Sequence, residues 1–201
     1  MNDASKPLKR RKSIPSPLSI AAVQAAPSFD PARLVRYIGG VNRAQNERVL
    51  AKIEKLLASD PAAPITLFVS SPGGATGAAM SFYDTLAHVL KPQLITIGSG
   101  DVDSSGVILF LCGERRYISA RTTLLLHTAG RQFGSGARYT TREVEAMLAE
   151  DRLKDAQYAN LVAARSRGIL SASDVLTMME RNTVLAPADL LAYGLADAIL
   201  D

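Results

Sequence analysis

Short apolar runs alternate with amphipathic segments over most of the chain. Five runs are almost continuously apolar, as buried strands are: residues 34–38, 65–70, 94–97, 116–118 and 123–126. Spaced apolar positions between them predict helices over residues 43–58, 76–90 and 105–111. Apolar strands that alternate with helices favour an α/β fold with a buried parallel sheet and right-handed crossovers.

The pattern changes at both ends of this region. Residues 141–165 are charge-rich with apolar positions spaced along them, which predicts one long helix that can project from the domain. Ser171 is placed to cap a further helix over residues 172–181. Residues 1–30 are rich in Pro, Ser and Lys without a period, so we expect a disordered tail there and one folded domain over residues 31–201.

Charge and composition give no support for nucleic-acid binding or for a membrane span. The net charge is +4, and residues 1–12, with five basic residues and one acid, account for all of it. The 18 basic and 18 acidic residues that remain are balanced, so nothing indicates a nucleic-acid-binding domain. No apolar run reaches the ~18 residues of a membrane span. The single cysteine, Cys112, cannot form an internal disulfide and suits the reducing cytoplasm.

The basic N-terminus raises one alternative for the tail. A basic stretch followed by residues 14–26 has the order of an export signal. Pro15 and Pro17 interrupt its apolar part, however, and a solvated arm is the interpretation that we favour.

Candidate chemistry falls in three segments that each follow a predicted strand. The carboxyl ends of parallel strands meet at one edge of a sheet, where sites form. Residues 71–74 read Ser-Pro-Gly-Gly, a turn whose backbone N–H groups suit an oxyanion. Ser104 lies at a strand-to-helix elbow, and His127 ends an apolar strand as the base that a serine nucleophile needs. Each segment alone also fits an ordinary turn, helix cap or packing residue.

The sequence carries no sign of a cofactor. The two histidines, His88 and His127, and the one cysteine have no spacing typical of metal ligands. The glycine-rich stretches match neither of the common phosphate-binding motifs. We therefore expect neither a metal nor a cofactor.

Taken together, five segments resemble the proteolytic subunit of the Clp protease over residues 33–201. They are the strand ending in Ser-Pro-Gly-Gly (65–74), the helical segment 81–86, Ser104-Ser105-Gly106, His127, and the ending from Tyr193 to Leu200. The resemblance implies a ClpP/crotonase-like spiral of ββα units, with residues 141–165 as its protruding helical handle. It also implies a serine endopeptidase.

The resemblance further assigns residues and partners. Ser104 would be the nucleophile and His127 the base, with the N–H groups of Gly74 and Ser105 as the oxyanion hole. Members of the family form stacked seven-membered rings, which receive unfolded polypeptides from an ATP-driven unfoldase. We therefore expect a homo-oligomeric ring, an unfoldase and polypeptide substrates as partners, and neither nucleic acid nor a membrane.

The third catalytic residue departs from the family pattern. The family usually has an aspartate in a Glu-Arg-Asp-Thr segment, and here residues 180–183 read Glu-Arg-Asn-Thr, which places Asn182 in the position of the acid. A match without gaps from the C-terminus places Met178 there instead, and Asp174 lies about one helical turn earlier. Asp101 and Asp103 also flank the nucleophile, where the family usually has uncharged residues.

These departures leave other functions open. The first is a catalytically impaired ring subunit that supports an active paralogue. The others are a crotonase-like acyl-CoA enzyme, which shares the spiral fold, and a phage-type maturation protease of the same fold.

Overall fold

The computed structural model describes residues 28–201, so most of the predicted tail lies outside the described residues. A five-stranded parallel sheet with the order β1-β2-β3-β4-β7 forms its centre. The strands are β1 (Leu34–Ile38), β2 (Ile65–Ser71), β3 (Leu94–Val102), β4 (Arg115–Ser119) and β7 (Ala198–Leu200). The mixed α/β fold with a mainly parallel sheet is confirmed, and it is consistent with a ClpP/crotonase-like protein.

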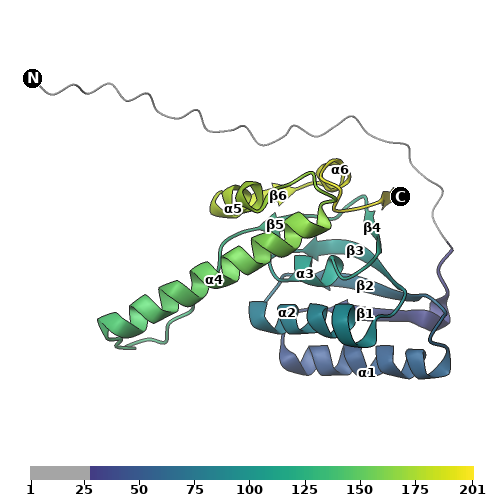
Figure 1. The fold of residues 1–201 in the computed structure, drawn as a ribbon, viewed down its shortest axis with the longest axis horizontal. Coiled ribbons are helices and arrows are strands. Elements are labelled where there is room, and N and C mark those ends of the chain that lie inside the picture. The colour runs from purple at the N-terminus through teal and green to yellow at the C-terminus, as the bar shows by residue number, and fades with distance from the viewer. Residues whose placement is uncertain (1–27) are drawn as a thin grey trace, which may run out of the picture.

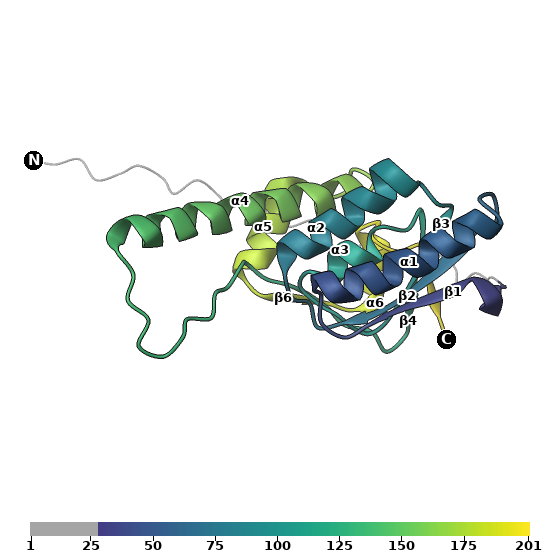
Figure 2. The same ribbon diagram turned by 90° about the horizontal axis from the view of Figure 1, so that it is seen from below.

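Helices pack against this sheet and enclose the main core (Figures 1 and 2). They include α1 (Arg43–Ser59), α2 (Thr76–Asp84), its π-helical continuation η2 (Thr85–Leu90) and α3 (Gly106–Phe110); a short 3-10 turn, η1 (Pro31–Arg33), precedes β1. Strand alternation sends Leu67 and Val69 into this core, whereas Ile95, Ile97 and Tyr117 form a smaller apolar cluster. Asn42 caps α1, because its side chain accepts a hydrogen bond from the N–H of Gln45 at 2.9 Å.

Two predictions about strands were wrong. The apolar run at 123–126 does not join the parallel sheet: β5 (Leu124–Leu126) pairs antiparallel with β6 (Thr183–Leu185). The strand predicted over residues 94–97 is too short: β3 continues to Val102, which donates to the carbonyl of Thr123 and pairs with Ser71 across a bulge. Both changes bring β5 next to the end of β3.

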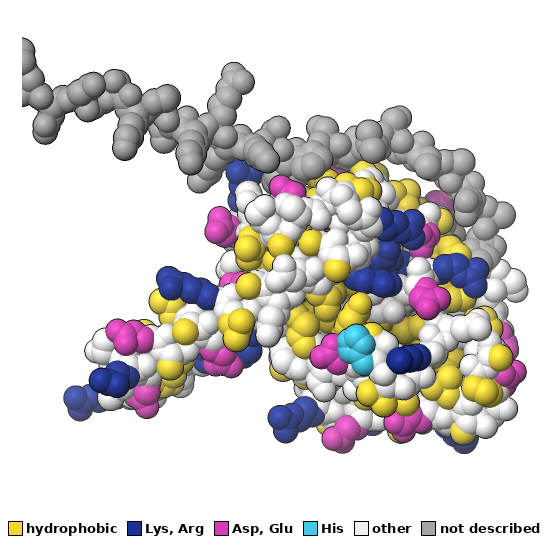
Figure 3. Space-filling model, in the orientation of Figure 1, with side chains coloured by type: hydrophobic (Ala, Val, Ile, Leu, Met, Phe, Trp, Pro, Cys, Tyr) yellow, Lys and Arg dark blue, Asp and Glu magenta, His cyan; other side chains and the backbone are white. Residues whose placement is uncertain are grey.

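Helix α4 (Thr141–Arg165) has the predicted bounds and extends well beyond the sheet (Figure 1). Thr140 and Glu143 form a capping box at its start, which fixes that end. Its last turns carry the buried Tyr158, Ala159 and Val162, whereas charged and apolar side chains lie exposed along its projecting part (Figure 3). The chain then forms α5 (Ala172–Glu180) and α6 (Pro187–Ala192). None of the helices in residues 28–201 is long and apolar enough to cross a membrane.

Candidate active site

A cavity of about 360 Å³ lies where the segments after β2, β3 and β5 meet α4. Four of the five predicted site residues line it, namely Gly74, Ser104, Ser105 and His127. The rest of its wall comes from the start of α2, from residues that follow His127, from α4 and from α5: Ala75, Thr76, Thr128, Ala129, Gly130, Arg131, Asp151, Lys154, Asp155, Tyr158 and Met179. The cavity therefore joins segments that are far apart in the sequence.

Two glycines after β2 permit the close packing around the nucleophile. Gly73 has a φ of +94°, and a Cβ atom there would lie 2.6 Å from the Cβ of Ser104. Gly74 has a φ of +149°, and its Cβ would lie 2.4 Å from the carbonyl oxygen of Val41. Only glycine can adopt these dihedral angles and allow such close approaches. Steric constraints therefore explain why both residues 73 and 74 are glycines.

Ser104 occupies a strained elbow between β3 and α3. Its φ is +53°, which is uncommon for a residue with a side chain and is typical of a nucleophile held at a sharp strand-to-helix turn. Its N–H donates to the carbonyl of Leu125 at 2.8 Å, and its own carbonyl accepts from the hydroxyl of Tyr158 at 2.9 Å. Burial raises the pKa of Tyr158, so the phenol stays protonated as the donor.

The N–H groups of Gly74 and Ser105 face no acceptor within residues 28–201, although both residues line the cavity. Two unpaired donors beside a serine are what an oxyanion requires. The Ser105 side chain is only 1% exposed, and its hydroxyl has no hydrogen-bond partner in the described part of the chain. Because Ser104 is half-buried and Ser105 is not accessible, Ser104 is the better placed of the two hydroxyls.

His127 follows β5 directly, and its Nδ1 atom lies 2.7 Å from the carbonyl oxygen of Thr128. A carbonyl oxygen only accepts, so this contact requires a proton on Nδ1 and leaves Nε2 as the basic nitrogen. Over the described residues, no direct hydrogen bond joins the imidazole to Ser104. Hydrogen bonds of this kind are often long without a substrate and shorten when one binds.

The carboxylate of Asp103 is bonded to the backbone of β5. Its Oδ1 atom accepts a hydrogen bond from the N–H of Leu125 at 2.8 Å. Burial raises the pKa of the Asp103 carboxyl; the hydrogen bond from Leu125 opposes this shift and the charge of Asp101 adds to it. The two aspartates that depart from the family pattern are not among the residues that line the cavity.

The candidates for the third residue lie outside the cavity. Asn182 is exposed in the turn between α5 and β6, with a φ of +50°. Because Leu126 pairs with Thr183, the antiparallel register places Asn182 opposite His127, one step beyond the last pair. Asp174 accepts hydrogen bonds from Ser171 at the start of α5, and Met178 is buried. The role of Asn182 therefore stays a prediction, supported by register and not by a side-chain contact.

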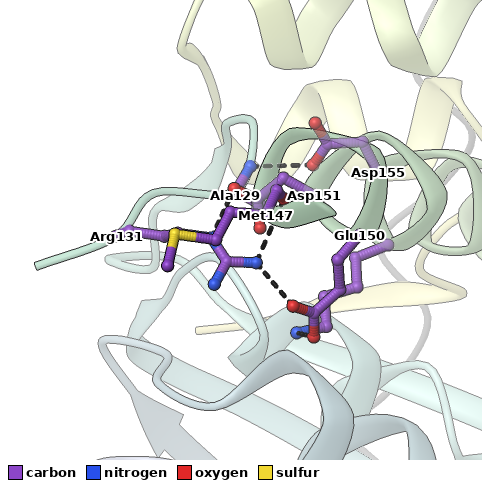
Figure 4. A network of polar contacts seen from close by, with 7 residues as sticks. Ala129, Arg131, Met147, Glu150, Asp151 and Asp155 are labelled. Carbon is purple, nitrogen blue, oxygen red and sulfur yellow. Dashed lines mark hydrogen bonds and ion pairs between the residues drawn. The ribbon is translucent and has the colours of Figure 1, made fainter. Parts of the chain in front are cut away.

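The segment after His127 is tied to α4 by polar contacts that the sequence did not reveal (Figure 4). The N–H of Ala129 donates to Asp155 at 2.7 Å. Arg131 donates to Asp151 at 2.7 Å, to Glu150 at 2.6 Å and to the carbonyl of Met147 at 3.1 Å. Asp151, Asp155 and Tyr158 follow one another at spacings of four and three residues, which places them on one face of the helix. Glu150 is adjacent to Asp151. This spacing is the only sign of these residues in the sequence.

Other chemistry has little support from the geometry. Burial raises the pKa of the Cys112 thiol, which stays protonated and is a poor nucleophile. His88 is exposed on η2 and lies 3.8 Å from Asp84, away from the cavity. In residues 28–201, no group of three or more His, Cys, Asp or Glu side chains is arranged to hold a metal ion.

The fold and the cavity define a mixed α/β protein of the ClpP/crotonase type, with a serine at a strained elbow and a histidine nearby. A family model described as Clp protease matches residues 22–201. The chain therefore belongs to the Clp protease family. By family it is a ClpP-like peptidase, and hence a hydrolase.

Proposed function

We propose that this protein is a serine endopeptidase that cleaves unfolded polypeptides, with Ser104 as the nucleophile and His127 as the base. The observation that carries the proposal is the cavity itself. It brings together the strained Ser104, the imidazole of His127 and the two unpaired N–H groups of Gly74 and Ser105. Together these are the parts that acyl transfer needs.

The chemistry follows from these positions. Oγ of Ser104 attacks the carbonyl carbon of the substrate while Nε2 of His127 takes its proton. The N–H groups of Gly74 and Ser105 donate to the oxygen that becomes negative. The imidazolium then protonates the leaving amine, and water, activated by the same histidine, hydrolyses the acyl-enzyme. Asn182 lies opposite His127 in the register of β5 and β6, and we propose that it helps to orient the imidazole.

The proposal extends to the assembly and its surroundings. The projecting part of α4 exposes Val144, Leu148 and Leu153, each about half accessible, which supports a homo-oligomer that buries this helix. Family membership supports stacked rings that receive substrate from an ATP-driven unfoldase, and the single cysteine supports action in the cytoplasm.

The test is covalent labelling with a fluorophosphonate, read by intact mass and peptide mapping. We expect one label per chain on Ser104. The variants Ser104→Ala and His127→Ala should remain unlabelled, while exposed His88→Ala labels like the wild type and controls for loss of a histidine. Labelling at another residue, or none in a folded oligomer, would contradict the proposal.

One observation favours a second candidate, a ring subunit with impaired catalysis. Nδ1 of His127 lies against a backbone carbonyl, and no side-chain carboxylate contacts it in the described residues. A serine with a weakly supported base reacts slowly. An assembled protein that resists the fluorophosphonate but increases the activity of an active paralogue in mixed rings would favour this candidate.

A further inference from the structure

One peptide group lies between His127 and helix α4. The carbonyl of Thr128 is 2.7 Å from Nδ1 of His127. The N–H of Ala129, which belongs to the same peptide group, donates to Oδ1 of Asp155 at 2.7 Å. No peptide bond in the described chain is cis, so this C=O and N–H point in opposite directions. Imidazole, peptide and carboxylate therefore form one continuous chain of hydrogen bonds.

The direction of each bond is fixed by chemistry. The carbonyl can only accept, so Nδ1 of His127 donates, and the N–H of Ala129 can only donate, so Asp155 accepts. A carboxylate that accepts from the N–H polarises the peptide group and makes its carbonyl a stronger acceptor, because linked hydrogen bonds strengthen one another. The bond to Thr128 in turn holds the tautomer in which Nε2 is free to take a proton.

We infer that Asp155 is a positioning residue for His127, acting on the imidazole through the Thr128–Ala129 peptide group. This inference rests on the proposed function of His127 as the base. Asp155 thereby supplies a negative charge from α4 through a peptide group. In the family, the third residue supplies this charge by direct contact, and Asn182 carries no charge.

A second attachment keeps the peptide group in place. Arg131, two residues beyond Ala129, donates to Asp151 and Glu150 on the same face of α4. Lys154 joins this network through Glu150, at 2.5 Å. The segment after the histidine is therefore held at two adjacent turns of the helix, so the peptide group cannot rotate without breaking these contacts.

Other charged groups lie near His127 or in the same cavity, but none of them bonds to the imidazole in the described residues. Asp103 acts on His127 electrostatically from the elbow before α3, and it is bonded to Leu125 rather than to the ring. Arg131, Asp151 and Lys154 line the same cavity but are paired with one another or with Glu150. Among the hydrogen bonds of the described residues, only the one that Asp155 accepts leads through a peptide group to Nδ1.

The experiment measures the tautomer of His127 by 15N NMR on the full chain labelled at histidine. The chain has two histidines, and exposed His88 is an internal reference. At slightly alkaline pH we expect the wild type to carry its proton on Nδ1 of His127. Asp155→Ala should shift the population towards the Nε2-protonated form and slow fluorophosphonate labelling of Ser104 by at least about tenfold, since a wrong tautomer is costly.

Two matched variants separate the roles of shape and charge. Asp155→Asn keeps an oxygen that can accept from Ala129, so it should retain the tautomer and label at a rate between those of the wild type and Asp155→Ala. Glu145→Gln removes a charge from an exposed position on α4 and should match the wild type. If Asp155→Ala does not fold, Asp155→Asn carries the test, and labelling as fast as that of Glu145→Gln would overturn the inference.

The outcomes distinguish this inference from the proposed function. An unchanged tautomer and labelling rate in Asp155→Ala, with Ser104 still labelled, would overturn the role of Asp155 and leave the peptidase intact. A tautomer that depends on Asp155 in a protein whose Ser104 does not react would sustain the positioning role while the proposed function fails.

Discussion

The N–H of Ser104 donates to the carbonyl of Leu125 at 2.8 Å, two residues before His127. The N–H of Leu125 in turn donates to Asp103, so both backbone groups of this one residue bind the nucleophile elbow. Nucleophile and base are therefore positioned by a shared junction rather than by separate loops. Substitutions that move either side of the junction should therefore affect both groups.

Gly73→Ala should reduce labelling of Ser104 sharply. The new Cβ would lie 2.6 Å from the Cβ of Ser104, at a φ that disfavours any side chain, so the elbow must move. Gly77→Ala is the matched control, because nothing lies within 4 Å of its added Cβ in the first turn of α2. That control should label normally and gain up to about 1 kcal/mol of unfolding free energy. Equal labelling of the two variants would show that the close packing at Gly73 is dispensable.

Tyr158→Phe should weaken both stability and reactivity. It keeps the ring in the core but leaves the carbonyl of Ser104 without the hydroxyl that lies 2.9 Å away. The carbonyl still accepts from the N–H of Val107 at 3.1 Å, so the variant loses one of two hydrogen bonds at this oxygen. That loss should cost about 0.5–1.5 kcal/mol, which urea unfolding at fixed protein concentration would measure. The labelling rate of Ser104 should fall as well, because the elbow loses its hydrogen bond to α4. A variant as stable and reactive as the wild type would mean that solvent replaces the phenol.

Much of the fold was predictable because its signals are local. The bounds of α4 follow from the capping box of Thr140 and Glu143 and from regular spacing along one helix. The pairing of β5 with β6 was not predictable, since three-residue strands carry no pattern that distinguishes a parallel from an antiparallel partner. Ser104 and His127 were expected to meet because both follow strands, and they do line one cavity.

The contact between Asp155 and Ala129 shows what a sequence alone conceals. The donor is a backbone N–H, which every residue except proline carries, so nothing in the residue type of Ala129 marks it. Only the packing of α4 beside the segment after His127 creates the pair. Ser104 and His127, which were predicted from their side-chain types, line one cavity, whereas the role inferred for Asp155 depends on a backbone contact that residue types do not reveal.

Asn182→Gly tests the predicted third residue. Glycine keeps the positive φ of this turn and removes only the amide side chain. Because Thr128 already accepts from Nδ1 of His127, we expect labelling of Ser104 to slow less than in Asp155→Ala. Asn182→Asp should accelerate labelling, since a carboxylate opposite His127 favours the imidazolium. A larger loss in Asn182→Gly than in Asp155→Ala would make Asn182 the principal orienting group.

Asp103→Asn should change how stability depends on pH. Burial raises the pKa of Asp103, so the folded protein disfavours the carboxylate. The protonated acid therefore contributes stability that is fully present below its ordinary pKa of 3.8 and is lost as the pH rises through the raised value. Asparagine does not titrate, so the free energy of unfolding of the variant should rise relative to that of the wild type between acidic and neutral pH. Urea unfolding across that pH range measures the difference in unfolding free energy. If this free energy depended on pH in the same way in the wild type and the variant, the prediction would be contradicted.

Asp197→Ala should destabilise the attachment of the C-terminal strand β7. It tests whether Asp197, within the family-like ending from Tyr193 to Leu200, has a structural role. Oδ2 of Asp197 accepts from the N–H of Arg116 at 2.7 Å, and its own N–H donates to the carbonyl of Arg116 at 2.7 Å, which attaches β7 to β4. Loss of the carboxylate leaves the buried Arg116 N–H unpaired, at a cost of about 1–3 kcal/mol in urea unfolding.

Arg167→Ala is the control for this last prediction, because Arg167 forms only an ion pair with Asp197 and is more than half exposed. Its cost should be about 0–1 kcal/mol, as for other surface pairs, and should shrink further in high salt. A loss in Asp197→Ala that matched the loss in Arg167→Ala and vanished in salt would mean that the ion pair, and not the backbone hydrogen bond, holds β7. A loss that persists in salt would make Asp197 a structural residue, and would explain this part of the family resemblance without any role in catalysis.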